Sequence, residues 1–87
     1  MILLFFGSQK CNKCQTMLLM FKDLNLTTEQ FLYIDIHDDK NDEICTIFDI
    51  WEVPYTLIID NLENMNILFE RQGYFNVNIL KEKLLNS

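Results

Sequence analysis

Residues 2–24 read ILLFFGSQKCNKCQTMLLMFKDL, and this stretch decides the fold. The unbroken apolar run Ile2–Phe6 predicts a strand that is covered on both faces, as in a parallel sheet flanked by helices. After a short polar loop, the apolar residues at helical spacing are Met17, Met20, Phe21 and Leu24. This stripe predicts a helix over Cys11–Leu24, so a strand passes into a helix within a few residues.

Cys11 and Cys14 stand at the junction between this strand and this helix. A helix N-terminus lowers the pKa of a thiol that lies on it, and the spacing lets the second thiol reach the first. The pair is therefore suited to dithiol–disulfide exchange. Zinc sites use the same spacing but need four ligands, and the further candidates of the usual type are only Cys45 and His37. We expect Cys45 to be a buried small hydrophobe on the opposite face of the sheet, and His37 to be solvated.

Five further elements follow along the chain. The expected strands are Phe31–Ile36, Tyr55–Ile59 and Met65–Arg71, and the expected helices are Lys40–Trp51 and Val77–Leu85. The residues expected to face the core from these helices are Ile44, Ile47, Phe48, Trp51, Val77, Leu80 and Leu84. For Trp51, three residues before Pro54, the alternative is a place in a substrate surface. Asn76 is the expected N-cap of the last helix. The order is β-α-β-α-β-β-α, in which the right-handed crossover rule makes the first two strands parallel and a short turn makes the last two an antiparallel hairpin.

The composition sets bounds on the function. With 87 residues, 49% of them hydrophobic, the chain can bury one core, and we expect a single domain over residues 1–87. The net charge of −6 argues against binding to nucleic acids or to anionic membranes. The first apolar run lacks the basic region of a signal peptide, and no run approaches the ~20 apolar residues of a membrane span. The odd number of cysteines, one close pair and one further residue, does not suit a fully paired disulfide framework and fits a reducing cytoplasm. We therefore expect a cytoplasmic protein, and we expect it to be a monomer.

Three features stand in register with the expected elements: Cys11 and Cys14 at the first strand-to-helix junction, Val53-Pro54 before the third strand, and Gly73 before the last helix. On these features the chain resembles the thioredoxin and glutaredoxin superfamily over essentially its whole length. Each of these features is weak alone, but all three are in register with the right elements. The resemblance implies a thioredoxin-like α/β fold, with a four-stranded mixed sheet flanked by three helices.

The resemblance also implies an enzyme, a thiol–disulfide oxidoreductase that reduces protein or small-molecule disulfides in cell redox homeostasis and electron transport. Cys11 would attack the substrate disulfide, and Cys14 would resolve the mixed disulfide. Pro54 would be a cis-proline that faces the active site, and the backbone of Val53 would be free to pair with an extended substrate. The other expected substrate-binding residues are Lys10, Lys13, Tyr55 and Gly73. No metal or cofactor is implied beyond the redox-active disulfide, and the electron donor would be thioredoxin reductase or glutathione.

The chain departs from the superfamily at several positions. Thioredoxins carry an aromatic residue just before the nucleophile and a buried acid six residues before it, where this chain has Lys10 and Phe5. Glutaredoxins bind glutathione with a Thr-Val-Pro segment and a Gly-Gly-x-Asp turn, where this chain has Glu52-Val53-Pro54 and the single Gly73. The poor match at the glutathione positions favours a protein disulfide or a thioredoxin-reductase-type partner. The missing acid at Phe5 and the missing aromatic residue at Lys10 leave open a thioredoxin-fold binding module with vestigial cysteines. A metal-binding protein that uses the two cysteines is the third alternative.

Overall fold

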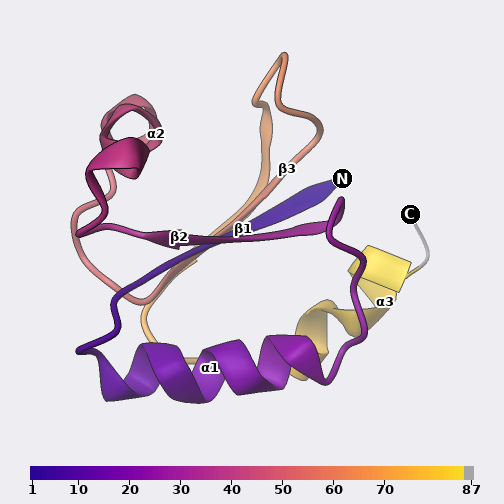
Figure 1. Ribbon diagram of the computed structural model, residues 1–87. Coiled ribbons are helices and arrows are strands. Elements are labelled where there is room, and N and C mark those ends of the chain that lie inside the picture. The colour runs from indigo at the N-terminus through magenta and orange to yellow at the C-terminus, as the bar shows by residue number, and fades with distance from the viewer. Residues whose placement is uncertain (86–87) are drawn as a thin grey trace.

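The structure is a computed structural model that describes residues 1–85, so the last two residues of the predicted domain 1–87 lie outside the described residues. The elements are β1 (Ile2–Gly7), α1 (Asn12–Lys22), β2 (Phe31–Asp35), a 3₁₀ turn (Asp39–Asn41), α2 (Asp42–Phe48), β3 (Tyr55–Ile59), β4 (Ile67–Gln72), a second 3₁₀ turn (Val77–Leu80) and α3 (Lys81–Leu85) (Figure 1). This order of strands and helices confirms the predicted one.

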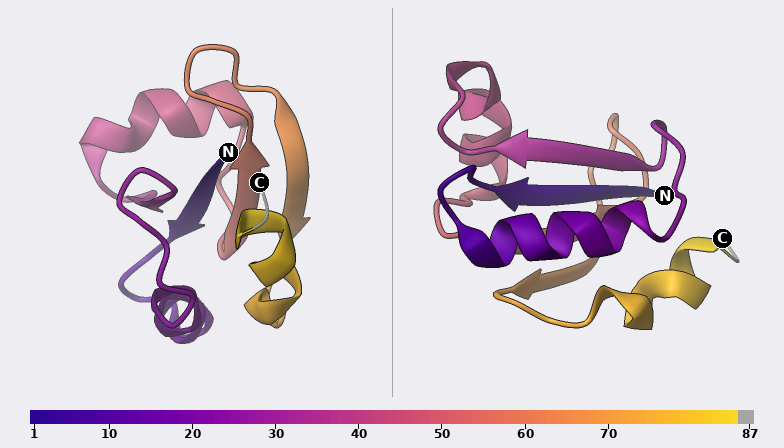
Figure 2. Two further views of the ribbon diagram at one scale, coloured as in Figure 1. Left: turned by 90° about the vertical axis from the view of Figure 1, so that its right-hand side faces the viewer. Right: turned by 60° about the horizontal axis from the view of Figure 1, so that its bottom comes forward.

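The four strands form one mixed sheet in the order β2-β1-β3-β4. β1 pairs in parallel with β2 and antiparallel with β3, and β3 and β4 form the predicted antiparallel hairpin. Figures 1 and 2 show α1 and α3 on one face of the sheet and α2 on the other. Both faces of the central strand are therefore covered by helices.

The side chains of β1 alternate between two cores. Leu3 and Phe5 belong to the cluster under α1 and α3, whereas Leu4 and Phe6 belong to the cluster under α2. All four are 0% exposed, which confirms the prediction of a strand covered on both faces. Phe5 packs on Phe21 of α1 with ring centroids 5.0 Å apart. Burial of each such side chain contributes roughly 1.5–3 kcal/mol, so this strand fixes α1 and α2 on their faces.

The second helix is shorter than the predicted range Lys40–Trp51. Asp49 adopts a left-handed conformation with φ of 55°, and the backbone N–H groups of Asp49 and Ile50 bond to carbonyls of the last turn. This cap ends the helix and turns the chain. The prediction that Ile47 and Trp51 face the core is therefore wrong, because each is 53% exposed, and Ile50 is buried instead.

The C-terminal part of the chain follows the prediction with small shifts. The predicted helix Val77–Leu85 is divided between the second 3₁₀ turn and α3. Asn76 caps this segment, because its side chain accepts a hydrogen bond from the backbone N–H of Asn78 at 3.0 Å. The residues predicted to point inward are all buried: Val77, Leu80 and Leu84. β4 begins two residues later than predicted, since Met65 has a left-handed φ of 54° and belongs to the turn.

Candidate active site

Cys11 is the N-cap of α1. Its backbone is extended, and its Sγ accepts a hydrogen bond from the backbone N–H of Cys14 at 3.1 Å. Ser8 holds the preceding loop, because its carbonyl accepts from the backbone N–H of Cys11 and from the side-chain amide of Gln15, both at 3.1 Å. The sulfur of Cys11 is thereby fixed at the positive end of an 11-residue helix.

Cys11 and Cys14 are joined by a disulfide, with their Cα atoms 5.2 Å apart. Cys14 is 0% exposed, whereas Cys11 is only partly buried. The first turn of α1 contains no acidic residue. After reduction, the helix dipole and the N–H of Cys14 would both stabilise a thiolate on Cys11. The two cysteines are therefore unequal, because Cys11 keeps part of its surface exposed to solvent and Cys14 does not.

The loop before β3 reaches both cores. The Val53–Pro54 peptide bond is cis, and Val53 packs against the cluster that contains Cys14, as Cys11 does, and also against the cluster under α2. The carbonyl of Pro54 accepts a hydrogen bond from the backbone N–H of Gly73 at 2.8 Å, so this N–H anchors the loop and is not available to a substrate. The backbone of Val53 has no hydrogen-bond partner within residues 1–85. A free N–H and C=O are what an added strand needs.

The two lysines predicted to flank the site are both exposed. Lys13 lies in the first turn of α1, and Lys10 lies in the loop before it. Lys10 also lines a small pocket, whose other residues are Ser8, Gln9, Asp35 and His37. His37 is exposed, as predicted, and its backbone N–H donates to the Asp35 carboxylate at 2.9 Å.

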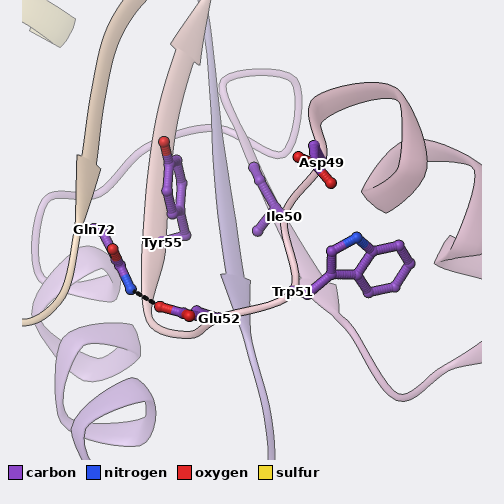
Figure 3. A pocket seen from close by; sticks show the side chains of 6 residues that line it. All are labelled: Asp49, Ile50, Trp51, Glu52, Tyr55 and Gln72. Carbon is purple, nitrogen blue, oxygen red and sulfur yellow. Dashed lines mark hydrogen bonds between the residues drawn. The ribbon is translucent and has the colours of Figure 1, made fainter.

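Tyr55 lines a second pocket beside the cis-proline loop (Figure 3). The other lining residues are Asp49, Ile50, Trp51, Glu52 and Gln72. Figure 3 shows the hydrogen bond from Gln72 to Glu52 on one side, and Trp51 on the other side near Asp49. The Tyr55 hydroxyl donates to the Glu70 carboxylate at 3.0 Å. Sequence reasoning missed Gln72, which only the pairing of β3 with β4 places opposite Tyr55.

Cys45 lies on the other face of the sheet, in the cluster under α2, and it is 0% exposed. Burial and the nearby carboxylate of Asp42 raise its pKa. The expectation of a buried small hydrophobe away from the motif is confirmed. Among residues 1–85, no three His, Cys, Asp or Glu side chains are grouped so that they could hold a metal ion. Over the same residues, no helix has the length and apolar character to cross a membrane.

Solved structures of thioredoxins share this architecture. A mutant thioredoxin from Halobacterium salinarum NRC-1 is 20% identical, with a TM-score of 0.76, and the match covers 98% of this chain and 72% of that chain. The reduced thioredoxin pre-protein of Schistosoma mansoni is 20% identical, with a TM-score of 0.72 and coverage of 98% and 76%. Thioredoxin 1 from Thermosipho africanus TCF52B is 18% identical, with a TM-score of 0.70 and coverage of 99% and 92%.

Neither a protein-family model nor a curated protein matches the chain. The likeness is therefore one of structure, and it extends over nearly the whole chain. The element order, the sheet topology and these solved structures together show that the chain adopts the thioredoxin fold.

Proposed function

We propose that the protein is a thiol–disulfide oxidoreductase that reduces disulfides of proteins or small molecules. The observation that carries the proposal is the disulfide between Cys11 and Cys14 at the N-terminus of α1, in which Cys11 is partly exposed and Cys14 is buried. The thioredoxin fold supports it, because the similar solved structures are thioredoxins.

The reaction follows from the inequality of the two sulfurs. In the reduced protein, the Cys11 thiolate attacks one sulfur of the substrate disulfide, the substrate S–S bond breaks, and one substrate thiolate leaves and takes up a proton. The Cys14 sulfur then attacks the Cys11 sulfur, and the second substrate thiol is released. The substrate gains two electrons, and the protein ends with the Cys11–Cys14 disulfide that the structure contains.

The loop before β3 supports an extended polypeptide as the substrate. The unpaired backbone of Val53 beside the motif would bond to it as to an added strand. Only Val53 and Pro54 match the glutathione-binding positions, so we propose that a thioredoxin-reductase-type donor recycles the protein. We also propose that the protein is cytoplasmic and monomeric. This choice of donor is tested by measuring how fast the oxidised protein is reduced by NADPH with thioredoxin reductase and, separately, by glutathione.

The test of the proposed function is the reduction of insulin disulfides with dithiothreitol as the electron source. The wild-type protein is expected to accelerate the reduction, and Cys11→Ser is expected to abolish the acceleration. Cys45→Ser is the matched control, because this cysteine lies on the opposite face of the sheet, and full activity is expected. Activity that survives in Cys11→Ser, or no activity in the wild type, contradicts the proposal and favours a binding module.

A further inference from the structure

Two buried hydroxyl groups lack a hydrogen-bond partner in the described part of the chain, Tyr33 Oη and Thr56 Oγ1. Both residues flank Phe5 in the sheet, since Phe5 pairs with Tyr33 on β2 and with Thr56 on β3. Directly paired residues share a face, so both side chains lie on the α1 face, as Phe5 does. An unpaired buried hydroxyl costs roughly 1–3 kcal/mol, and each such group calls for an explanation.

Tyr33 and Cys14 both lie against Gly7 at the end of β1. A Cβ atom added to Gly7 would lie 3.3 Å from the Tyr33 hydroxyl and 3.2 Å from the Cβ of Cys14. Both side chains therefore approach the same small space at the end of β1, and the missing side chain of Gly7 allows them to do so. Tyr33 also packs against the cluster that contains Cys14.

The surroundings of Cys14 offer little else that could stabilise a thiolate on its sulfur. Cys14 is fully buried and must lose its proton before it can attack. β1 has no titratable side chain, and Lys13 and Lys22 of α1 are exposed. Burial and, to a lesser extent, the Asp35 carboxylate on the same strand raise the pKa of Tyr33. The Gln15 amide on α1 lies near enough to the phenol to offset part of this shift, but it makes no hydrogen bond of standard geometry with the hydroxyl. The phenol therefore keeps its proton at neutral pH and serves as a donor.

We propose that the Tyr33 hydroxyl donates a hydrogen bond to the Cys14 sulfur of the reduced protein, and thereby stabilises the thiolate that resolves the mixed disulfide. This inference rests on the proposed function. A disulfide sulfur is a weak acceptor, which agrees with the unpartnered hydroxyl of the oxidised structure, whereas a thiolate is a strong one.

The Cys14 thiol gives its proton to water, and its sulfur bonds to the Cys11 sulfur. The bond between Cys11 and the substrate sulfur breaks, and the substrate sulfur leaves with the electron pair and takes up a proton from water. Tyr33 keeps its own proton throughout.

The test uses 5,5′-dithiobis(2-nitrobenzoate) and the reduced protein, with Cys45→Ser in every variant so that the third thiol does not react. The attack by Cys11 releases the first nitrothiobenzoate, and the resolving attack by Cys14 releases the second. Tyr33→Phe is expected to slow the second release by about tenfold to a hundredfold, the effect of losing one hydrogen bond to a charged group, and to move its pH midpoint upward. The first release is expected to stay unchanged.

Thr56→Val is the matched control, because it removes the other unpartnered hydroxyl from the same face, and both releases are expected to stay unchanged. Gly7→Ala is the second variant should Tyr33→Phe fail to fold, and it is expected to slow the second release, because the added methyl group separates Tyr33 from Cys14. A normal second release in Tyr33→Phe, an equal slowing of both releases, or a slowing in Thr56→Val alone overturns the proposal. A wild-type protein without a second release refutes the proposed function itself.

Discussion

Two cysteines, one on each face of the sheet, are equally buried and differently placed. Cys14 under α1 and Cys45 under α2 are both 0% exposed. Cys14 lies in the first turn of a helix without an acidic residue there, and it is bonded to the N-cap residue Cys11. Cys45 lies inside a seven-residue helix whose first turn is acidic, and Asp42 helps to raise its pKa. Position along a helix, and not burial, separates the disulfide-bonded Cys14 from the free Cys45.

The two faces also differ in their polar groups. The cluster under α2 consists of Leu, Ile and Phe side chains together with Cys45. Within residues 1–85, both unpartnered buried hydroxyls lie on the α1 face, at Tyr33 and Thr56. A well-packed apolar face needs no such groups, so the two unpartnered hydroxyls under the disulfide are a difference between the faces that calls for an explanation.

Replacing Cys14 and Cys45 in turn is the test with the largest expected effect on the difference between these two cysteines. Cys14→Ser is expected to stop turnover and to trap a covalent adduct between Cys11 and the substrate, because nothing then resolves the mixed disulfide. Cys45→Ser is expected to keep full turnover and to form no adduct. Intact-mass spectrometry under non-reducing conditions measures the adduct. Similar behaviour of the two variants would remove the distinction between the faces.

Alkylation of the reduced protein compares the accessibility of the thiols on the two faces of the sheet. A pulse of iodoacetamide at pH 8 is expected to label Cys11 about a hundredfold or more faster than Cys45, because Cys45 reacts only when the structure opens locally. Peptide mass spectrometry gives the two rates. Urea-unfolded protein is the control, in which Cys45 is expected to react like a free thiol. Rapid labelling of native Cys45 would contradict its assigned place in the core.

The pH dependence of this labelling has a definite sign. The pKa of Cys45 is raised in the folded state above its ordinary value of 9.0, so folding favours the protonated thiol. The resulting stability is present below pH 9 and is lost as the pH rises through the folded pKa. Labelling of native Cys45 through local opening is therefore expected to go on rising above pH 9, where labelling of the urea-unfolded protein levels off.

Much of the fold was predictable because its signals are local. The apolar run Ile2–Phe6, the cysteine pair after it and the cap at Asn76 each specify an element within a few residues. The end of α2 was not predictable in this way. The stripe of apolar residues continues to Trp51, but Asp49 adopts a left-handed conformation that ends the helix first.

The surroundings of Cys14 were not predictable from the sequence for another reason. The sequence shows that Phe5 stands where thioredoxins carry an acid, but not which side chains flank it. Only the register of β1 with β2 and with β3 places Tyr33 and Thr56 on either side of it. Such a register depends on long-range packing, and a single sequence carries little information about it.

Thr56→Val gives the smallest expected effect, and it tests the polar difference between the faces directly. The swap replaces a buried, unpartnered hydroxyl by a methyl group, so it is expected to raise the free energy of unfolding by about 1 kcal/mol. Urea unfolding of the oxidised protein measures the change. Thr46→Val on α2 is the matched control, because that hydroxyl is exposed and bonds to the Asp42 carbonyl at 2.8 Å, so no gain is expected. A loss of stability in Thr56→Val would mean that the Thr56 hydroxyl has a hydrogen-bond partner in solution. At this position the α1 face would then contain no unpartnered polar group, like the face under α2.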